Sequence, residues 1–135
     1  MLERLGLAMA GAASGLFVAA HVGSSVPALT SQGFLLVMML AGAIGFYLGI
    51  DTPPLPFHST GDPPPNGDSR GGIDTAEFLS AVGTFLAACA AVAAVGVIIL
   101  RHDPHIAWTA MIMAGWVLGV TMQIVAGAIA RFRAA

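Results

Sequence analysis

Charged residues are scarce in this chain of 135 amino acids, and lysine is missing altogether. Asp, Glu, Lys and Arg make up 9% of the sequence, and none of them occurs within residues 5–50, 78–100 or 104–130. A water-soluble domain needs a charged surface, whereas about 20 consecutive, mostly apolar residues are enough for a helix to cross a bilayer. We therefore expect an integral membrane protein, and the mean hydropathy of +0.87 agrees.

Other absences narrow the range of functions. The single cysteine, Cys89, excludes an intrachain disulfide. The chain has no nucleophile with a histidine and an acid at a recognisable spacing, and no glycine-rich phosphate loop. A net charge of −2 is too small to indicate a nucleic-acid partner. We expect no enzymatic activity, no nucleic-acid binding and no obligatory cofactor.

Four apolar segments predict four transmembrane helices, over residues 5–22, 33–50, 76–100 and 106–130. The fold class expected is therefore all-α, an integral membrane four-helix bundle formed by two hairpins.

Local signals support the helix ends. Thr30 and Ser31 can cap the second helix, and Asp74 with Glu77 is typical of a capping box for the third. Asp103 followed by Pro104 is typical of a cap with proline at the first helical position of the fourth.

The segment 51–75 joins the two hairpins and contains six of the eight prolines. Its Pro/Gly-rich composition predicts a flexible, solvated loop, with a docking segment for a partner as the alternative. This loop and both termini should share one side of the membrane, which carries four of the five arginines. The positive-inside rule places that side, with both termini, in the cytoplasm. The membrane expected is a bacterial inner (plasma) membrane. The leader, in which Glu3 and Arg4 leave no net side-chain charge, and the lack of a small-residue cleavage site argue against a removed signal peptide.

Small residues predict close helix packing, because lipid gives helices no hydrophobic drive to associate. The first, second and fourth predicted helices each contain a Gly-x-x-x-Gly pattern. The third predicted helix instead has a face of alanines with Gly83. The glycines of these patterns are Gly11 and Gly15, Gly45 and Gly49, and Gly115 and Gly119. These faces can pack within one bundle or bind other subunits.

Few residues offer chemistry within the spans. Gln123, Thr121 and Thr84 can bond between helices, or can line a polar path shared by several protomers. His21, His102 and His105 all fall on the side opposite the termini, where they offer a possible metal or haem site. No carboxylate lies at mid-bilayer, which argues against proton-coupled antiport.

These patterns favour a non-catalytic membrane protein that acts as an accessory or assembly subunit of a larger complex. Its expected partners are the lipid bilayer and other membrane subunits. The alternative is a homo-oligomeric channel or carrier for a small solute. The third hypothesis is a haem- or metal-binding redox subunit.

Overall fold

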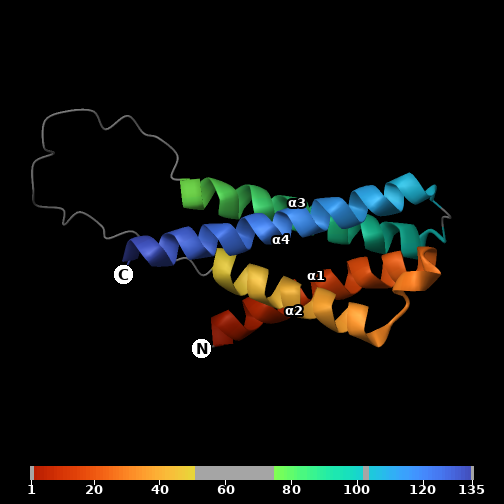
Figure 1. Ribbon diagram of the computed structural model, residues 1–135, viewed down its shortest axis with the longest axis horizontal. Coiled ribbons are helices and arrows are strands. Elements are labelled where there is room, and N and C mark those ends of the chain that lie inside the picture. The colour runs from red at the N-terminus through yellow and green to blue at the C-terminus, as the bar shows by residue number, and fades with distance from the viewer. Residues whose placement is uncertain (1, 51–74, 102–103, 135) are drawn as a thin grey trace, which may run out of the picture.

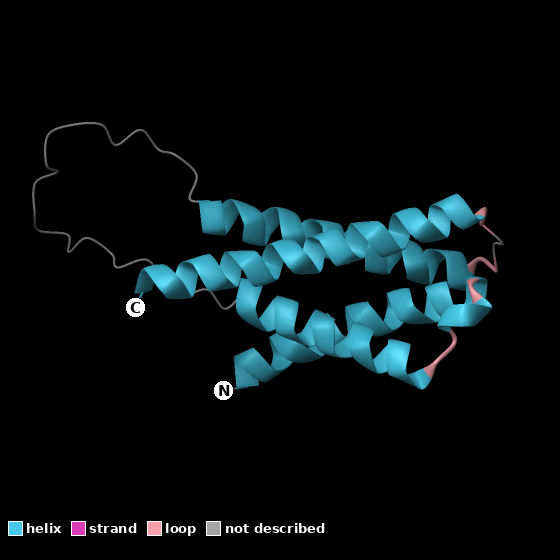
Figure 2. Ribbon diagram, in the orientation of Figure 1, coloured by secondary structure: helices cyan, strands magenta, loops and turns pink. Residues whose placement is uncertain are grey.

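The computed structural model describes residues 2–50, 75–101 and 104–134. Within these ranges the chain is helical and contains no strand (Figure 2). Four long helices are present: α1 (Leu2–Ser25), α2 (Gln32–Ile50), α3 (Thr75–Ile99) and α4 (Ile106–Ala134), with a short 3-10 turn η1 (Pro27–Leu29) between the first two. All four are long and apolar enough to span a membrane, so the predicted all-α, multi-pass fold is confirmed. The predicted flexible loop 51–75 lies almost wholly outside the described residues.

The helices extend beyond the predicted apolar runs. α1 begins at Leu2 and ends at Ser25, and α4 continues to Ala134 instead of ending at residue 130. The added residues include Glu3, Arg131 and Arg133, which are good helix formers. Because a helix can continue past the hydrocarbon, hydropathy marks the membrane-buried length and underestimates the helix.

The predicted caps have mixed outcomes. Ser31 caps α2 as expected, since its Oγ accepts a hydrogen bond from the Phe34 N–H at 3.1 Å. The Thr30 hydroxyl does not cap α2 but donates to the Gly23 carbonyl at 2.9 Å. The fourth helix begins at Ile106, as the range 106–130 predicted, so the expected place of Pro104 at its first helical position is wrong. Its cap is His105, whose Nδ1 accepts from the Ala107 N–H at 3.3 Å and whose carbonyl accepts from the Trp108 N–H at 2.8 Å. Asp74 and Asp103 lie outside the described residues.

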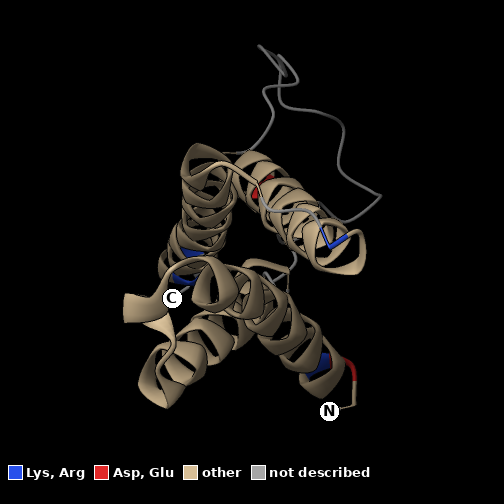
Figure 3. Ribbon diagram, turned by 90° about the vertical axis from the view of Figure 1, so that its right-hand side faces the viewer, with Lys and Arg blue, Asp and Glu red and all other residues tan. Residues whose placement is uncertain are grey.

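The two hairpins, α1–α2 and α3–α4, lie side by side in one bundle (Figure 1). Successive helices alternate in direction, so that both described ends of the chain lie at the same end of the bundle (Figure 1). The second hairpin meets the first mainly through α2 against α4, while α1 and α3 touch less extensively. Seen end-on, the helices carry few charged positions (Figure 3).

The helices cross at glycines. A Cβ added to Gly11 would lie 2.1 Å from the Gly42 carbonyl oxygen, and one added to Gly119 would lie 2.6 Å from the Gly83 oxygen. No atom pair approaches so closely without repulsion, so the backbones touch only because side chains are missing there. α2 is in contact on two faces, since Gly42 meets α1 while Gly45 meets Val120 of α4.

Large apolar side chains cover the outside of the bundle. Each helix exposes several of them, including Leu40 on α2, Phe85 and Val92 on α3, and Leu118 on α4. Patches this extensive are unsuited to water, and they match the acyl chains of a bilayer.

Candidate functional site

Trp116 fills the centre of the bundle, where α4 meets the crossing of α1 and α2. Only 1% of its surface is exposed, and its indole Nε1 donates a hydrogen bond to Ser14 Oγ at 3.2 Å. The Ser14 hydroxyl in turn donates to the Gly11 carbonyl at 2.8 Å. The buried indole N–H is therefore satisfied by a chain of two bonds that begins at the α1–α2 crossing.

Gln123 lies deeper toward the terminal end of the bundle and is fully buried. Its Nε2 donates to Thr84 Oγ1 at 2.9 Å, and the Thr84 hydroxyl donates to the Ser80 carbonyl at 2.7 Å. Its Oε1 is buried without a hydrogen-bond partner in the described part of the chain. Thr121 is exposed on the outside of α4 and donates to the Val117 carbonyl of its own helix. The structure thus brings together two of the three predicted path residues, and places the third on another face.

Substitutions at Gln123 and Thr84 test how much this buried hydrogen bond contributes to the stability of the bundle. Gln123→Met should leave the free energy of unfolding unchanged or raise it by about 1 kcal/mol. An interhelical bond in a membrane is worth about 0.6 kcal/mol, while the unpaired carbonyl oxygen costs about 1 to 3 kcal/mol. Thr84→Val should instead destabilise the bundle, because it leaves the amide N–H of Gln123 unpaired as well. Unfolding in SDS measures both variants, and a destabilised Gln123→Met protein would show that Oε1 has a partner.

His21 is buried at the other end of the bundle, where α1 approaches α4. Its Nε2 lies 3.3 Å from Thr109 Oγ1, and only 1% of the residue is exposed. Its Nδ1 has no hydrogen-bond partner among the described residues, and the side chain borders a polar cavity of about 730 Å³. Ser24 and Arg101 also line this cavity.

The predicted metal ligands do not form a cluster among the described residues. His105 caps α4 and faces a different cavity from His21. No three His, Cys, Asp or Glu side chains within residues 2–50, 75–101 and 104–134 could hold one metal ion. His102 lies outside the described residues, so the full three-histidine set stays a prediction.

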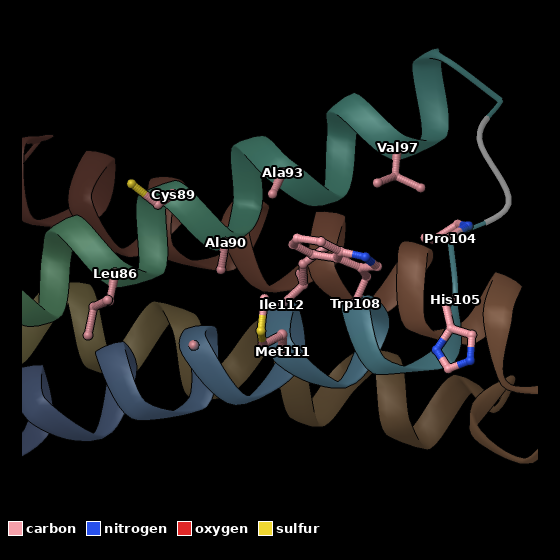
Figure 4. A pocket seen from close by; sticks show the side chains of 11 residues that line it. Leu86, Cys89, Ala90, Ala93, Val97, Pro104, His105, Trp108, Met111 and Ile112 are labelled. Atoms are coloured by element: carbon pink, nitrogen blue, oxygen red, sulfur yellow. The ribbon is translucent and has the colours of Figure 1, made fainter.

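A second cavity is a groove of about 650 Å³ between α3 and α4, which we call the α3–α4 groove. Its residues on α3 include Cys89, Ala90 and Ala93, and those on α4 include Trp108, Met111 and Gly115. Figure 4 shows α3 diverging from α4 toward Pro104, with Trp108 and Ile112 facing Ala90, Ala93 and Val97 across the gap. The helices touch at Gly83 and Gly119 and separate from there toward Pro104, which forms the groove.

The predicted packing glycines fall into two groups. Gly11, Gly15, Gly45, Gly49 and Gly119 each have atoms of another helix within 3 Å of an added Cβ. Gly115 has nothing within 4 Å and lines the α3–α4 groove.

Comparison with family models, with curated proteins and with solved structures finds no match to this chain.

Sequence reasoning missed several contacts. Gly42 and Gly127 lie at close helix approaches, to Gly11 and Leu48, but neither belongs to the predicted Gly-x-x-x-Gly pairs. Arg131 donates from Nη1 to the Leu48 carbonyl at 3.0 Å and so ties α4 to the end of α2. An arginine in the last turn of a helix signals such a carbonyl cap, although the sequence does not tell which helix supplies the carbonyl.

Proposed function

We propose that this chain is a non-catalytic subunit of a larger membrane assembly, and that the α3–α4 groove receives a transmembrane helix of a partner protein. The observation that carries the proposal is Gly115, a packing glycine with open space where the other five have a neighbouring helix. In membranes, small residues mark the surfaces where helix backbones approach one another. The bundle leaves this surface unused.

The dimensions of the groove fit a helix. It follows α3 from Leu86 to Val97, a rise of about 16 Å or three helical turns. Ala90 and Ala93 form one wall and Gly115 belongs to the other, so a partner backbone can come close to both. Trp108, which is 59% exposed, supplies a large flat ring at the wide end. Tryptophan is among the residues enriched at the energetically dominant positions of protein interfaces.

The orientation proposed is that of the arginine count, with both chain ends in the cytoplasm and the His21 end on the opposite side of a bacterial inner membrane. The shared end of the described chain termini supports an even number of crossings (Figure 1). The wide end of the groove then opens toward the non-cytoplasmic leaflet.

The second candidate is a homo-oligomeric channel or carrier. It is less favoured because Gln123 and Thr84 bond to each other inside the bundle while Thr121 lies outside. These residues do not share one surface that protomers could place around a pore.

The groove can be blocked without disturbing the bundle. Gly115→Leu should leave the free energy of unfolding within about 0.5 kcal/mol of wild type, because a Cβ at this position has no atom within 4 Å and the rest of the side chain can enter the groove. It should reduce recovery of the partner at least tenfold in a native pull-down from the source membrane. Ala114→Leu is the matched control, since Ala114 is the preceding residue, is exposed and does not line the groove.

A photocrosslinker placed at Ala93 identifies the occupant. We expect a crosslinked product with a protein of different sequence, and no product from a crosslinker at Ala114. A product made of two copies of this chain would support the homo-oligomer instead. Equal losses for Gly115→Leu and Ala114→Leu would show that partner binding does not use the groove.

A further inference from the structure

The cleft between α1 and α3 changes character along its length. Its middle part is an apolar cavity of about 430 Å³, bordered by Ala13 and Phe17 on α1 and by Ala88 and Val95 on α3. One turn further along both helices the cleft becomes the polar cavity of about 730 Å³. There His21 and Ser24 of α1 stand opposite the Arg101 end of α3.

The polar part offers hydrogen-bond donors to an anion. Arg101 is exposed, lines the cavity and has no ion-pair partner among the described residues. The Thr109 hydroxyl lies at Nε2 of His21. When that hydroxyl donates to Nε2, the single N–H of the neutral imidazole is at Nδ1, which has no hydrogen-bond partner among the described residues. A guanidinium and an imidazole N–H are suitable ligands for a phosphate. The hydroxyls of Ser24 and Ser25 already donate to the His21 carbonyl, so they add no donors.

The backbone at Arg101 has a conformation that disfavours arginine. Its φ is 50°, in the left-handed region, and its N–H bonds to the Ile98 carbonyl at 3.2 Å. Helices that end in this conformation usually have glycine at this position. An arginine here holds a positive charge at the end of α3, at the cost of backbone strain.

The apolar part has the depth of one leaflet. From His21 to Ala10, α1 rises about 16 Å, and half of the hydrocarbon core of a bilayer is about 15 Å. The cleft therefore has a polar end followed by an apolar part, in the same order as the phosphate group and the acyl chain of a phospholipid. The helix ends place the polar part at the membrane surface, since α1 ends at Ser25 and α3 at Ile99.

We propose that the α1–α3 cleft binds one anionic phospholipid, with its phosphate at Arg101 and His21 and one acyl chain against Ala13, Phe17 and Ala88. This site lies on a different face from most of the α3–α4 groove and does not depend on a protein partner. A lipid held here would lie between α1 and α3, which touch less extensively than α2 and α4, and would join the two hairpins.

The test uses native mass spectrometry of the purified full-length protein in detergent. Dioleoyl phosphatidylglycerol is the probe, dioleoylglycerol provides the same chains without phosphate, and inorganic phosphate provides the anion without chains. We expect saturable binding of the phospholipid and at least tenfold weaker binding of dioleoylglycerol. Arg101→Gln should weaken phospholipid binding about tenfold or more, the loss expected for a hydrogen bond to a charged group.

Matched variants separate the headgroup from the chain. Arg101→Lys should recover part of the binding, which also shows that the loss in Arg101→Gln is not caused by misfolding. Ala88→Phe should weaken binding by filling the apolar part, while Ala81→Phe, exposed on the same helix and outside the cleft, should not. Arg133→Gln, at the other end of the bundle, should also have no effect.

Three outcomes would overturn the proposal. Equal binding of dioleoylglycerol would remove the phosphate from recognition. Arg101-dependent binding of inorganic phosphate, with no effect of Ala88→Phe on phospholipid binding, would indicate a site for a free anion. Equal losses for Arg101→Gln and Arg133→Gln would indicate general attraction of anionic lipid to arginine.

Discussion

Gly11→Ala is expected to lower the free energy of unfolding by about 2 kcal/mol or more, although it adds only one methyl group. The added Cβ would lie 2.1 Å from the Gly42 carbonyl oxygen and 2.8 Å from the Phe46 Cβ. A flexible side chain could turn away, but a helix backbone cannot, so α1 and α2 must separate along their crossing. Overpacking a well-packed site costs about 1 to 3 kcal/mol, and the absence of any yielding atom places Gly11 in the upper part of that range.

The matched control for this prediction is Gly6→Ala in the same helix. Gly6 has no atom within 4 Å of an added Cβ, and alanine favours a helix over glycine by up to about 1 kcal/mol. Gly6→Ala should therefore be neutral or slightly stabilising. SDS titration followed by tryptophan fluorescence measures both variants. Equal stability of Gly11→Ala and Gly6→Ala would mean that α1 and α2 do not touch at Gly11.

Trp116→Ala is the second large effect expected, with a loss of about 3 kcal/mol. Trp→Ala in a protein core costs about 3 to 5 kcal/mol, through lost transfer free energy and the cavity left behind. In a membrane the transfer part is small, because the unfolded helices remain in apolar surroundings, so the lower end applies. The cavity would lie against Gly15 and Gly42, since Trp116 Cζ2 is 3.0 and 3.1 Å from a Cβ added at these residues.

Two further variants divide the contribution of Trp116 into its ring and its N–H group. Trp116→Phe keeps most of the ring and loses the bond to Ser14, so it should cost less than half of what Trp116→Ala costs. Ser14→Ala removes the same bond from the other side and should cost about 0.6 kcal/mol, the mean for an interhelical bond in a membrane. If Ser14→Ala costs as much as Trp116→Ala, polar bonding and not packing holds this part of the core.

The four spans were predictable because hydropathy depends on composition, and composition alone decides whether a segment is stable in hydrocarbon. Which face of each span points inward was not predictable for Trp116 or Met111. A soluble helix shows its buried face by contrast with polar residues, but here the core and the lipid are both apolar. Trp116 is buried and Met111 is 59% exposed, although both are large and apolar and lie on the same helix.

The pairing of the glycines shows the same limit. Gly-x-x-x-Gly indicates a close approach but does not specify the partner helix. Gly45 and Gly49 meet α4, while the first helix contacts Gly42, three residues before Gly45. Those three residues rotate the contact by about 60° around the helix, which is enough to face a different neighbour. The cavity near His21 was not predictable because its residues come from two distant parts of the sequence, within 20–25 and 97–104.

The two glycine faces of α2 have a consequence for biogenesis. The contacts of α2 with α1 join residues close in sequence, across a turn of a few residues, so this hairpin can form while the rest of the chain is still being synthesised. Gly45 and Gly49 must then face lipid until α4 has entered the membrane and brought Val120 and Gln123 against them. During that interval the newly inserted hairpin presents a bare glycine surface, and a membrane chaperone or insertase that shields small-residue faces would have its substrate there.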